Sequence, residues 1–243
     1  MAFFPPLHIL ERTVMTARAL TLLRLHIEAV WGIQLPPLTH HTVELLAEGK
    51  QPSWKLYAAE IANTQLAIYR PDIALSEREA LFARARQALA CPPTAYADPQ
   101  HISREVALEQ VAKPSISMAT AQRMARLLTL TDQEAVDRFE PGEVEYYFHS
   151  ERRPLVGVIV EGRLLCIAHS SRRTAQACEL GIETLPEARR RGYALAATLL
   201  WADAVAREGL ISFYSASATN TASLRLAAAA GYRAFAQGVT IDG

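Results

Sequence analysis

The sequence predicts a two-part α/β protein, with a mainly helical region over residues 1–117 and a mixed sheet flanked by helices over residues 118–243. In the first part, apolar residues recur mostly at helical spacing between proline and glycine stop signals. In the second part, short apolar runs alternate with helical segments in the order β-α-β-β-β-α-β-α-β. This order is typical of a mixed sheet with helices packed on it.

The first part contains five segments that we expect to be helical. The longest, 8–33, places Leu20, Leu23, Ile27 and Val30 on one face. The other four are 39–48, 54–69, 78–90 and 103–112.

Three of these segments differ in how strongly they favour a helix. The segment 54–69 is also compatible with a strand, because it ends in an apolar run before a proline; we favour the helix. Ser76 and Glu79 form a capping-box pattern at the start of 78–90, and Ser103 stands at the N-cap position of 103–112. The first part holds no glycine-rich loop, metal-ligand spacing or nucleophile elbow, so we interpret it as a structural or substrate-shaping module.

The second part contains a clear series of strands and helices. Asp132 is a good N-cap for its first helix, and Glu161-Gly162 is a hairpin signal. The expected strands are 124–131, 155–160, 164–169, 178–184, 210–216 and 232–241, and the expected helices are 133–139, 193–207 and 224–230.

Composition limits the classes of partner. Lys+Arg and Asp+Glu balance at 25 each, whereas proteins that bind nucleic acid usually carry a basic excess. Cys91, Cys166 and Cys178 form neither a disulfide framework nor a zinc pattern. The N-terminus does not read as a signal peptide, and no apolar run reaches the roughly 18 residues of a membrane span. We expect a soluble cytoplasmic protein that contacts neither nucleic acid nor a membrane, and we expect no metal site.

The stretch Glu179–Ala194 combines a strand, a basic turn and the start of a helix. The first turn of a helix leaves about four backbone N–H groups without partners, and the helix dipole adds positive charge there. Gly192 allows a ligand to approach the backbone closely, and three arginines precede it. This arrangement favours binding of a phosphate group.

The chain from about residue 123 to 243 resembles the GNAT superfamily of acyl-CoA-dependent N-acyltransferases. Arg189–Ala194 matches the family pattern Q/R-x-x-G-x-G/A at each fixed position. Ile182–Pro186 matches apolar-x-Val-x-Pro with threonine for valine. Asn220–Leu224 and Gly231-Tyr232 match the family's later N-x-x-A/S and G-F/Y motifs, and L-T-L-T-D at 128–132 looks like its opening strand and cap. The resemblance covers about half of the chain.

The resemblance implies that acetyl-CoA is the co-substrate and that its acetyl group moves to a primary amine. The pyrophosphate would bind the backbone N–H groups of the basic turn, and the pantetheine amides would pair with the strand end like an added strand. Asn220 would hold the arm of the co-substrate. The implied binding residues are Ile182, Glu183, Thr184, Arg189, Arg190, Arg191, Gly192, Tyr193, Ala194, Asn220 and Ser223.

The amine must lose a proton before it attacks, so a base with a pKa near the working pH is needed. Glu179 and Glu183 on the central strand are the candidates, and Glu179 is favoured because several family members carry a glutamate there. Many members also have a tyrosine, seven residues after the motif asparagine, that protonates the leaving thiolate. Here that position is Ala227, and Tyr214 or a water could replace it.

Several alternatives stay open at the level of sequence. His149 and His169 could enter a water-mediated relay to the base. Because Ala227 replaces the usual tyrosine, the chain could be a non-catalytic acyl-CoA-binding regulatory module. The first part could form a homodimer surface or be a decayed second copy of the domain, although it has no second R-x-x-G-x-G/A. The balanced charge does not select among peptides, aminoglycosides and polyamines as acceptors.

Overall fold

The computed structural model describes residues 7–38, 41–62, 64–92 and 101–243, with the backbone alone over 7–16. The chain forms two compact units. The first comprises the described residues of Met1–Ala107 with Ala216–Thr219 and Ala234–Gly243, and the second comprises Leu108–Ser215 and Asn220–Arg233. The predicted domain boundary after residue 117 does not coincide with this division. The division into compact units does not test that boundary, which remains a prediction.

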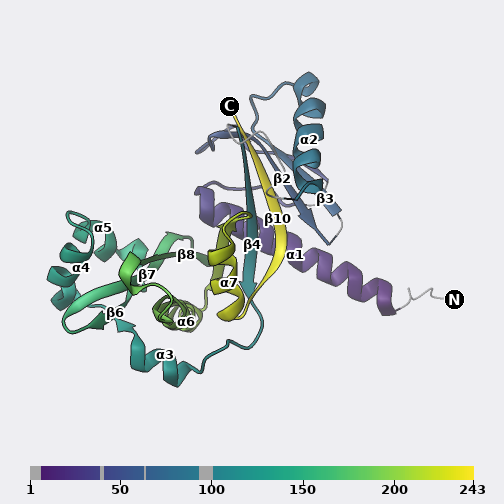
Figure 1. Ribbon diagram of the computed structural model, residues 1–243. Coiled ribbons are helices and arrows are strands. Elements are labelled where there is room, and N and C mark those ends of the chain that lie inside the picture. The colour runs from purple at the N-terminus through teal and green to yellow at the C-terminus, as the bar shows by residue number, and fades with distance from the viewer. Residues whose placement is uncertain (1–6, 39–40, 63, 93–100) are drawn as a thin grey trace. The chain divides into compact units, whose positions relative to one another are not determined.

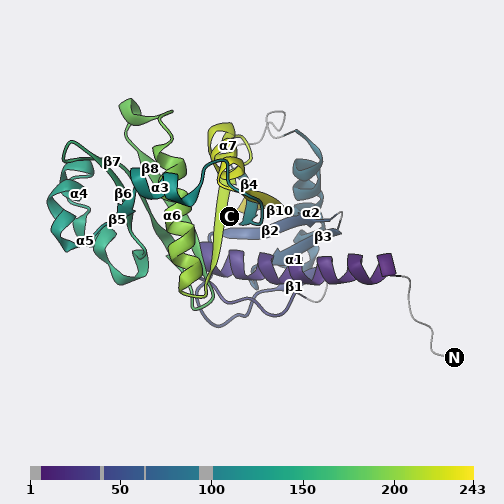
Figure 2. The same cartoon turned by 90° about the horizontal axis from the view of Figure 1, so that it is seen from below.

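The first unit is a sheet with a helix on each face. Its strands lie in the order β1-β3-β2-β10-β4, and Figure 2 shows α1 and α2 on opposite sides of β2 and β3. Leu23 and Ile27 of α1 pack on one face, and Ala85 and Leu89 of α2 pack on the other. The elements are α1 (Leu7–Trp31), β1 (Thr42–Glu44), β2 (Trp54–Ile61), β3 (Thr64–Tyr69), α2 (Leu75–Ala90), β4 (Ile102–Gln110) and the greater part of β10 (Tyr232–Asp242).

The prediction of a mainly helical first part is therefore wrong at three of its five segments. The segment 54–69 forms the antiparallel pair β2 and β3, 103–112 lies mostly in β4, and Thr42–Glu44 within 39–48 is a strand. β2 is buried on both faces, so its sequence shows no polar alternation, and an apolar run of this kind cannot be told from a buried helix by periodicity. Residues 39 and 40 lie outside the described residues.

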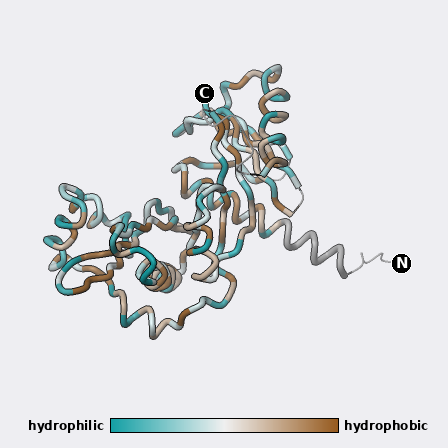
Figure 3. Tube along the Cα trace, viewed as in Figure 1, coloured by the Kyte–Doolittle hydropathy of each residue, from teal (hydrophilic) through white to brown (hydrophobic). Residues whose placement is uncertain are grey.

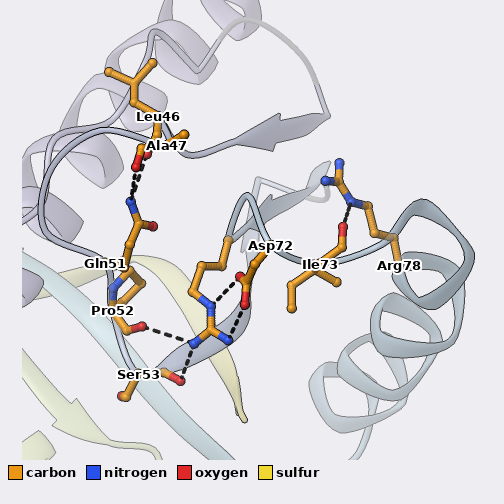
Figure 4. A network of polar contacts seen from close by, with 9 residues as sticks. Leu46, Ala47, Gln51, Pro52, Ser53, Asp72, Ile73 and Arg78 are labelled. Atoms are coloured by element: carbon orange, nitrogen blue, oxygen red, sulfur yellow. Dashed lines mark hydrogen bonds and ion pairs between the residues drawn. The ribbon is translucent and has the colours of Figure 1, made fainter.

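The two predicted helices that exist begin and end close to their expected positions. α2 begins at Leu75 with Ala74 at its N-cap, and no side chain caps it, so the capping box of Ser76 and Glu79 is not formed. The loops before this helix are held by Arg70, which binds Asp72 through two hydrogen bonds of 2.6 and 2.9 Å. It also donates to the carbonyl oxygens of Pro52 and Ser53, as Figure 4 shows.

The second unit is a mixed sheet in the order β9-β8-β7-β6-β5. α4 and α5 lie on one side of it and α6 lies on the other (Figure 1). Residues of β7 alternate between the two sides: Ile167 packs with α4 and α5, whereas Ser170 accepts a hydrogen bond from Trp201 of α6. Apolar residues gather along the strands of each unit, as Figure 3 shows.

The second unit follows the expected series of elements, which confirms the mixed α/β class. Its elements are α3 (Met118–Met124), β5 (Arg126–Leu127), η1 (Leu130–Asp132), α4 (Gln133–Phe139), α5 (Val144–Phe148), η2 (Ser150–Arg152), β6 (Val156–Val160), β7 (Arg163–Arg173), β8 (Ala177–Thr184), η3 (Pro186–Ala188), α6 (Tyr193–Arg207), β9 (Ile211–Ser217), α7 (Thr221–Ala229) and the start of β10.

One expected strand is much shorter than predicted. Of the segment 124–131, only Arg126 and Leu127 form a strand. Asp132 stands before α4 as expected, but its carboxylate binds the Thr129 backbone N–H and Arg126 instead of capping that helix. The segment is broken because the polar side chain of Asp132 closes a 3₁₀ turn over Leu130–Asp132.

The three cysteines are unbonded, and no described helix is both long enough and apolar enough to span a membrane.

We predict that Gly231→Ala destabilises the protein by about 2–4 kcal/mol, because an added Cβ strains a left-handed backbone and enters a filled space. Gly231 has φ +89°, and a Cβ there would lie 2.2 Å from the carbonyl oxygen of Ala112. Gly142→Ala is the matched control, since Gly142 has φ +86° and open space around it. Urea unfolding should show the larger loss at Gly231, and equal losses would contradict this close approach.

Candidate functional site

The candidate site lies where two neighbouring strands of the second unit separate. β8 pairs in parallel with β9 from Ala177 to Glu179, opposite Ile211–Phe213, and that ladder ends there. β8 then continues beside β7 as far as Thr184. The separation opens a cleft of about 640 Å³. It is lined by Phe139, Ile182, Glu183, Thr184, Leu185, Pro186, Arg189, Ala194, Tyr214, Asn220, Ala222, Ser223 and Leu226.

Glu179 stands at the point of separation. Its Oε1 accepts hydrogen bonds from the backbone N–H of Ser215, at 2.7 Å, and from the Ser215 hydroxyl, at 2.8 Å. The side chain therefore takes the place of a strand partner for β9, just beyond the last paired residue. Glu179 is only 5% exposed and is not among the residues that line the cleft. These contacts favour a structural role over the predicted role of base.

One end of the cleft is formed by the basic turn and the N-terminus of α6. Arg190 has φ +61° and Gly192, the N-cap residue, has φ +81°. Gly192 has no side chain to cap the helix, and the first intrahelical bond runs from Ala196 N–H to the Gly192 carbonyl. The preceding helical N–H groups, including that of Ala194 on the cleft wall, have no acceptor within the helix.

The three predicted arginines differ in position. Arg189 lines the cleft, and Arg190 and Arg191 are exposed on the turn without lining it. Tyr193, the first residue of α6, is half-buried. Of the three arginines, Arg189 is therefore the one at the cleft wall.

The opposite wall comes from β9 and α7. Asn220 is the N-cap of α7, and its Oδ1 accepts from the Ser223 backbone N–H at 3.0 Å. The Tyr214 hydroxyl lies 2.7 Å from the Ser223 hydroxyl, and burial raises the pKa of Tyr214. Ala227, at the position of the usual family tyrosine, is buried on α7. The sequence motif thus brings Asn220, Ser223 and Tyr214 together on one wall.

Glu183 is the carboxylate on the cleft wall. Burial, with a smaller repulsion from Glu140, raises its pKa to about 7. Its side chain is still 44% exposed, so water in the cleft reaches the carboxylate. Its Oε2 lies 3.5 Å from Nδ1 of the buried His169. A carboxylate that is partly protonated near neutral pH suits a general base.

The two histidines named by the sequence occupy different places. His169 adjoins Glu183, whereas His149 is exposed and its Nδ1 accepts from the Glu151 backbone N–H at 3.4 Å. The sequence reading missed Phe139, which lines the cleft, and Tyr146, which contacts His169. The adjacent aromatic residues Tyr146 and Tyr147 in α5 could have pointed to this contact. The sequence alone, however, does not show that α5 faces β7.

A family model described as GNAT acetyltransferase matches residues 147–237. This part of the chain is therefore similar to the GNAT acetyltransferases. The match includes β8, the basic turn, Asn220 and Ser223, and so takes in most of the residues that line the cleft. No curated protein is significantly similar to the chain.

Solved structures of GNAT proteins are similar to the chain at low identity. A protein from Colwellia psychrerythraea, described as an acetyltransferase of the GNAT family, is 17% identical over 72% of this chain and 75% of its own, with a TM-score of 0.49. A GCN5-related N-acetyltransferase-like protein from Streptococcus suis is 16% identical over 72% and 70%, with a TM-score of 0.44. A GNAT-family protein from Novosphingobium aromaticivorans is 21% identical over 59% and 66%, with a TM-score of 0.46. The chain therefore spans slightly less than two thirds of that last relative.

We predict that Glu179→Ala lowers the free energy of unfolding by about 1–3 kcal/mol, because the Ser215 N–H loses its acceptor. Glu179→Gln keeps an acceptor oxygen in the same place, so it should cost clearly less. Glu134→Ala is the control, since that side chain is 84% exposed and should be near neutral. Urea unfolding measures all three. Equal stability of Glu179→Ala and wild type would show that this contact does not hold the strands.

Proposed function

We propose that the GNAT domain transfers an acetyl group from acetyl-CoA to a primary amine. The observation that carries the proposal is the separation of β8 and β9 after Glu179, which opens a cleft with a helix N-terminus at one end and a titratable carboxylate on its wall. The family match supports an acyltransferase of this kind. The acceptor amine and the base are part of the proposal.

The residues on the cleft wall fit the parts of acetyl-CoA. The left-handed conformations of Arg190 and Gly192 turn the backbone of the basic turn, and the open N–H groups of α6 suit a pyrophosphate. The backbone of Ile182–Leu185, beyond the end of the β9 ladder, can pair with the pantetheine amides. The Asn220 amide nitrogen remains available for a carbonyl of the arm, because only Oδ1 is used in capping.

The chemistry needs two protons removed from the acceptor nitrogen and one supplied to the leaving sulfur. Acetyl-CoA supplies a thioester whose carbonyl carbon is open to attack. Glu183, directly or through water, takes a proton from the acceptor ammonium, and the free amine forms a C–N bond to that carbon. The nitrogen of the resulting tetrahedral intermediate gives its second proton to water, the C–S bond breaks and the CoA thiolate leaves. The Tyr214 hydroxyl or a water supplies the proton that the thiolate takes up, since burial keeps Tyr214 protonated.

A non-catalytic acyl-CoA-binding module is the second candidate. Ala227 stands where many members carry the tyrosine acid, and the Tyr214 hydroxyl is already engaged with Ser223. A screen for thiol release from acetyl-CoA, with a polyamine, an aminoglycoside and a lysine-containing peptide as acceptors, separates the two. Release with any of them excludes the non-catalytic reading, and binding without release supports it.

The cytoplasmic location and the homodimer stay predictions from the sequence. Sedimentation of the full chain tests the second.

We predict that Gly192→Val weakens CoA binding at least tenfold and that Arg189→Ala weakens it less. A valine at φ +81° is strained, and its side chain blocks approach to the N–H groups of the turn. Isothermal titration calorimetry with CoA measures both. Gly209→Val is the matched control, because Gly209 has φ +75° at the other end of α6 and does not line the cleft. It should lower stability but leave CoA affinity unchanged. The reverse order of Gly192→Val and Arg189→Ala would count against backbone binding of the pyrophosphate.

We predict that Glu183→Gln lowers the rate of thiol release by about 10²–10⁴-fold. In wild type, the rate should rise with pH through about 7, because the base acts in its ionised form and its pKa is raised to that value. That rise should vanish in Glu183→Gln. Glu179→Gln should keep most of the activity and the same pH profile. If Glu179→Gln instead lost the rise while Glu183→Gln kept it, the base would be Glu179.

A further inference from the structure

A buried histidine joins the cleft carboxylate to a tyrosine on the neighbouring helix. His169 of β7 is 2% exposed. Its Nδ1 lies 3.5 Å from Glu183 Oε2, and its Nε2 lies 3.2 Å from the Tyr146 hydroxyl. The rings of Tyr146 and Tyr147 meet the imidazole edge-on, with centroids 5.6 and 5.2 Å away. The imidazole is therefore held in one orientation.

The place of this ring depends on a glycine in the adjacent strand. Gly181 of β8 stands directly opposite His169 in the register. A Cβ at position 181 would lie 2.4 Å from Cε1 of the imidazole. Any other residue at 181 would displace the ring. The glycine therefore makes the contact between His169 and Glu183 possible.

Charge and burial decide which nitrogen carries the hydrogen. Burial, helped by Arg152 and Arg172, lowers the pKa of His169 to about 4, so the ring is neutral at neutral pH and has one N–H. Nδ1 is buried and makes no full hydrogen bond within the described residues; the Glu183 carboxylate is the acceptor beside it. A lone pair on Nδ1 would repel the ionised carboxylate. The hydrogen is therefore expected on Nδ1, with Nε2 accepting from the tyrosine.

We propose that Tyr146 and His169 are positioning residues that orient Glu183 and stabilise its ionised form: the Tyr146 hydroxyl donates to Nε2, and Nδ1–H donates to Glu183 Oε2. This inference rests on the proposed role of Glu183 as the base. The distance of 3.5 Å is at the outer limit of a hydrogen bond, and such contacts often shorten when substrates bind. The other carboxylate oxygen is then left for the acceptor amine or a water.

The negative charge near Glu183 has the opposite effect on its pKa from the Nδ1–H donor of His169. Glu140 raises the pKa of Glu183 by repulsion, and the Tyr147 hydroxyl donates to Glu140. The Cys166 thiol on β7 accepts from the Thr184 hydroxyl, and burial raises its pKa to about 12, so it stays neutral.

The tyrosine has a cationic neighbour of its own. The Arg152 guanidinium lies over the Tyr146 ring, 4.2 Å from its centroid. With the contacts above, the groups that face His169 are Tyr146, Tyr147, Arg152, Arg172 and Glu183. Among them, the Glu183 carboxylate is the acceptor that lies beside Nδ1, so loss of the histidine N–H should raise the pKa of Glu183.

The test is a titration of the full chain labelled with ¹³C at the glutamate carboxyl carbons, without acetyl-CoA or acceptor. The Glu183 signal is identified by its absence in Glu183→Gln. His169→Leu should raise its midpoint by about one pH unit, and Tyr146→Phe should raise it by less. His169→Asn, whose amide N–H can replace Nδ1–H, should keep the midpoint near that of wild type. His149→Asn is the matched control and should leave it unchanged.

Two further variants keep the test decisive. Gly181→Ala changes no titratable group but displaces the ring, so it should raise the midpoint as His169→Leu does. Tyr146→Phe removes only a hydroxyl, so it carries the test if His169→Leu fails to fold. In addition, ¹⁵N spectra of the His169 ring should show the hydrogen on Nδ1 in wild type.

An unchanged Glu183 midpoint in His169→Leu, or in Tyr146→Phe if that variant alone folds, would overturn the proposal. Hydrogen on Nε2 in wild type at a pH above the Glu183 midpoint would overturn it as well. Because these readouts need no turnover, they stand even if no amine releases thiol from acetyl-CoA. Absent thiol release with the expected titration shifts would instead refute the proposed function alone.

Discussion

The contact between Glu179 and Ser215 is the constraint on which the cleft depends. Two parallel strands that pair as far as residue 179 would ordinarily continue to pair, because unpaired backbone groups beside a sheet are costly. Here the Glu179 carboxylate accepts from the first unpaired N–H of β9, and β8 remains bonded to β7 alone. The strands can therefore separate without leaving that donor unsatisfied. The walls formed by β8 and α7, and the approach to the α6 N-terminus, follow from this separation.

Glu179 and Glu183 lie four residues apart on β8, but their surroundings differ, and so their roles differ. Glu179 lies deep between β8 and β9 and bonds with Ser215, whereas Glu183 lies on the cleft wall near His169 and Glu140. Both side chains have the same parity along β8, so the pattern of residues does not separate them. What separates them is the end of the β9 ladder, which comes after the first and before the second.

The sequence predicted the second unit well because its signals are local. The basic turn and Gly192 before α6 follow from backbone rules that operate within a few residues, and both are where they were expected. The first unit was predicted poorly, because β2 is covered by helices on both faces and its sequence has no alternation to reveal a strand. The contact of Tyr146 with His169 depends on α5 packing on β7, which only tertiary structure shows.

The most direct measurement of the central claim is hydrogen–deuterium exchange of the full chain with and without CoA. If the separated strand end and the helix N-terminus together bind CoA, CoA should slow exchange in both segments, 182–185 and 190–195. The paired residues 177–179 should change little, because their N–H groups are already within the sheet. Slowing confined to one of the two segments, or found only outside the cleft, would contradict the account.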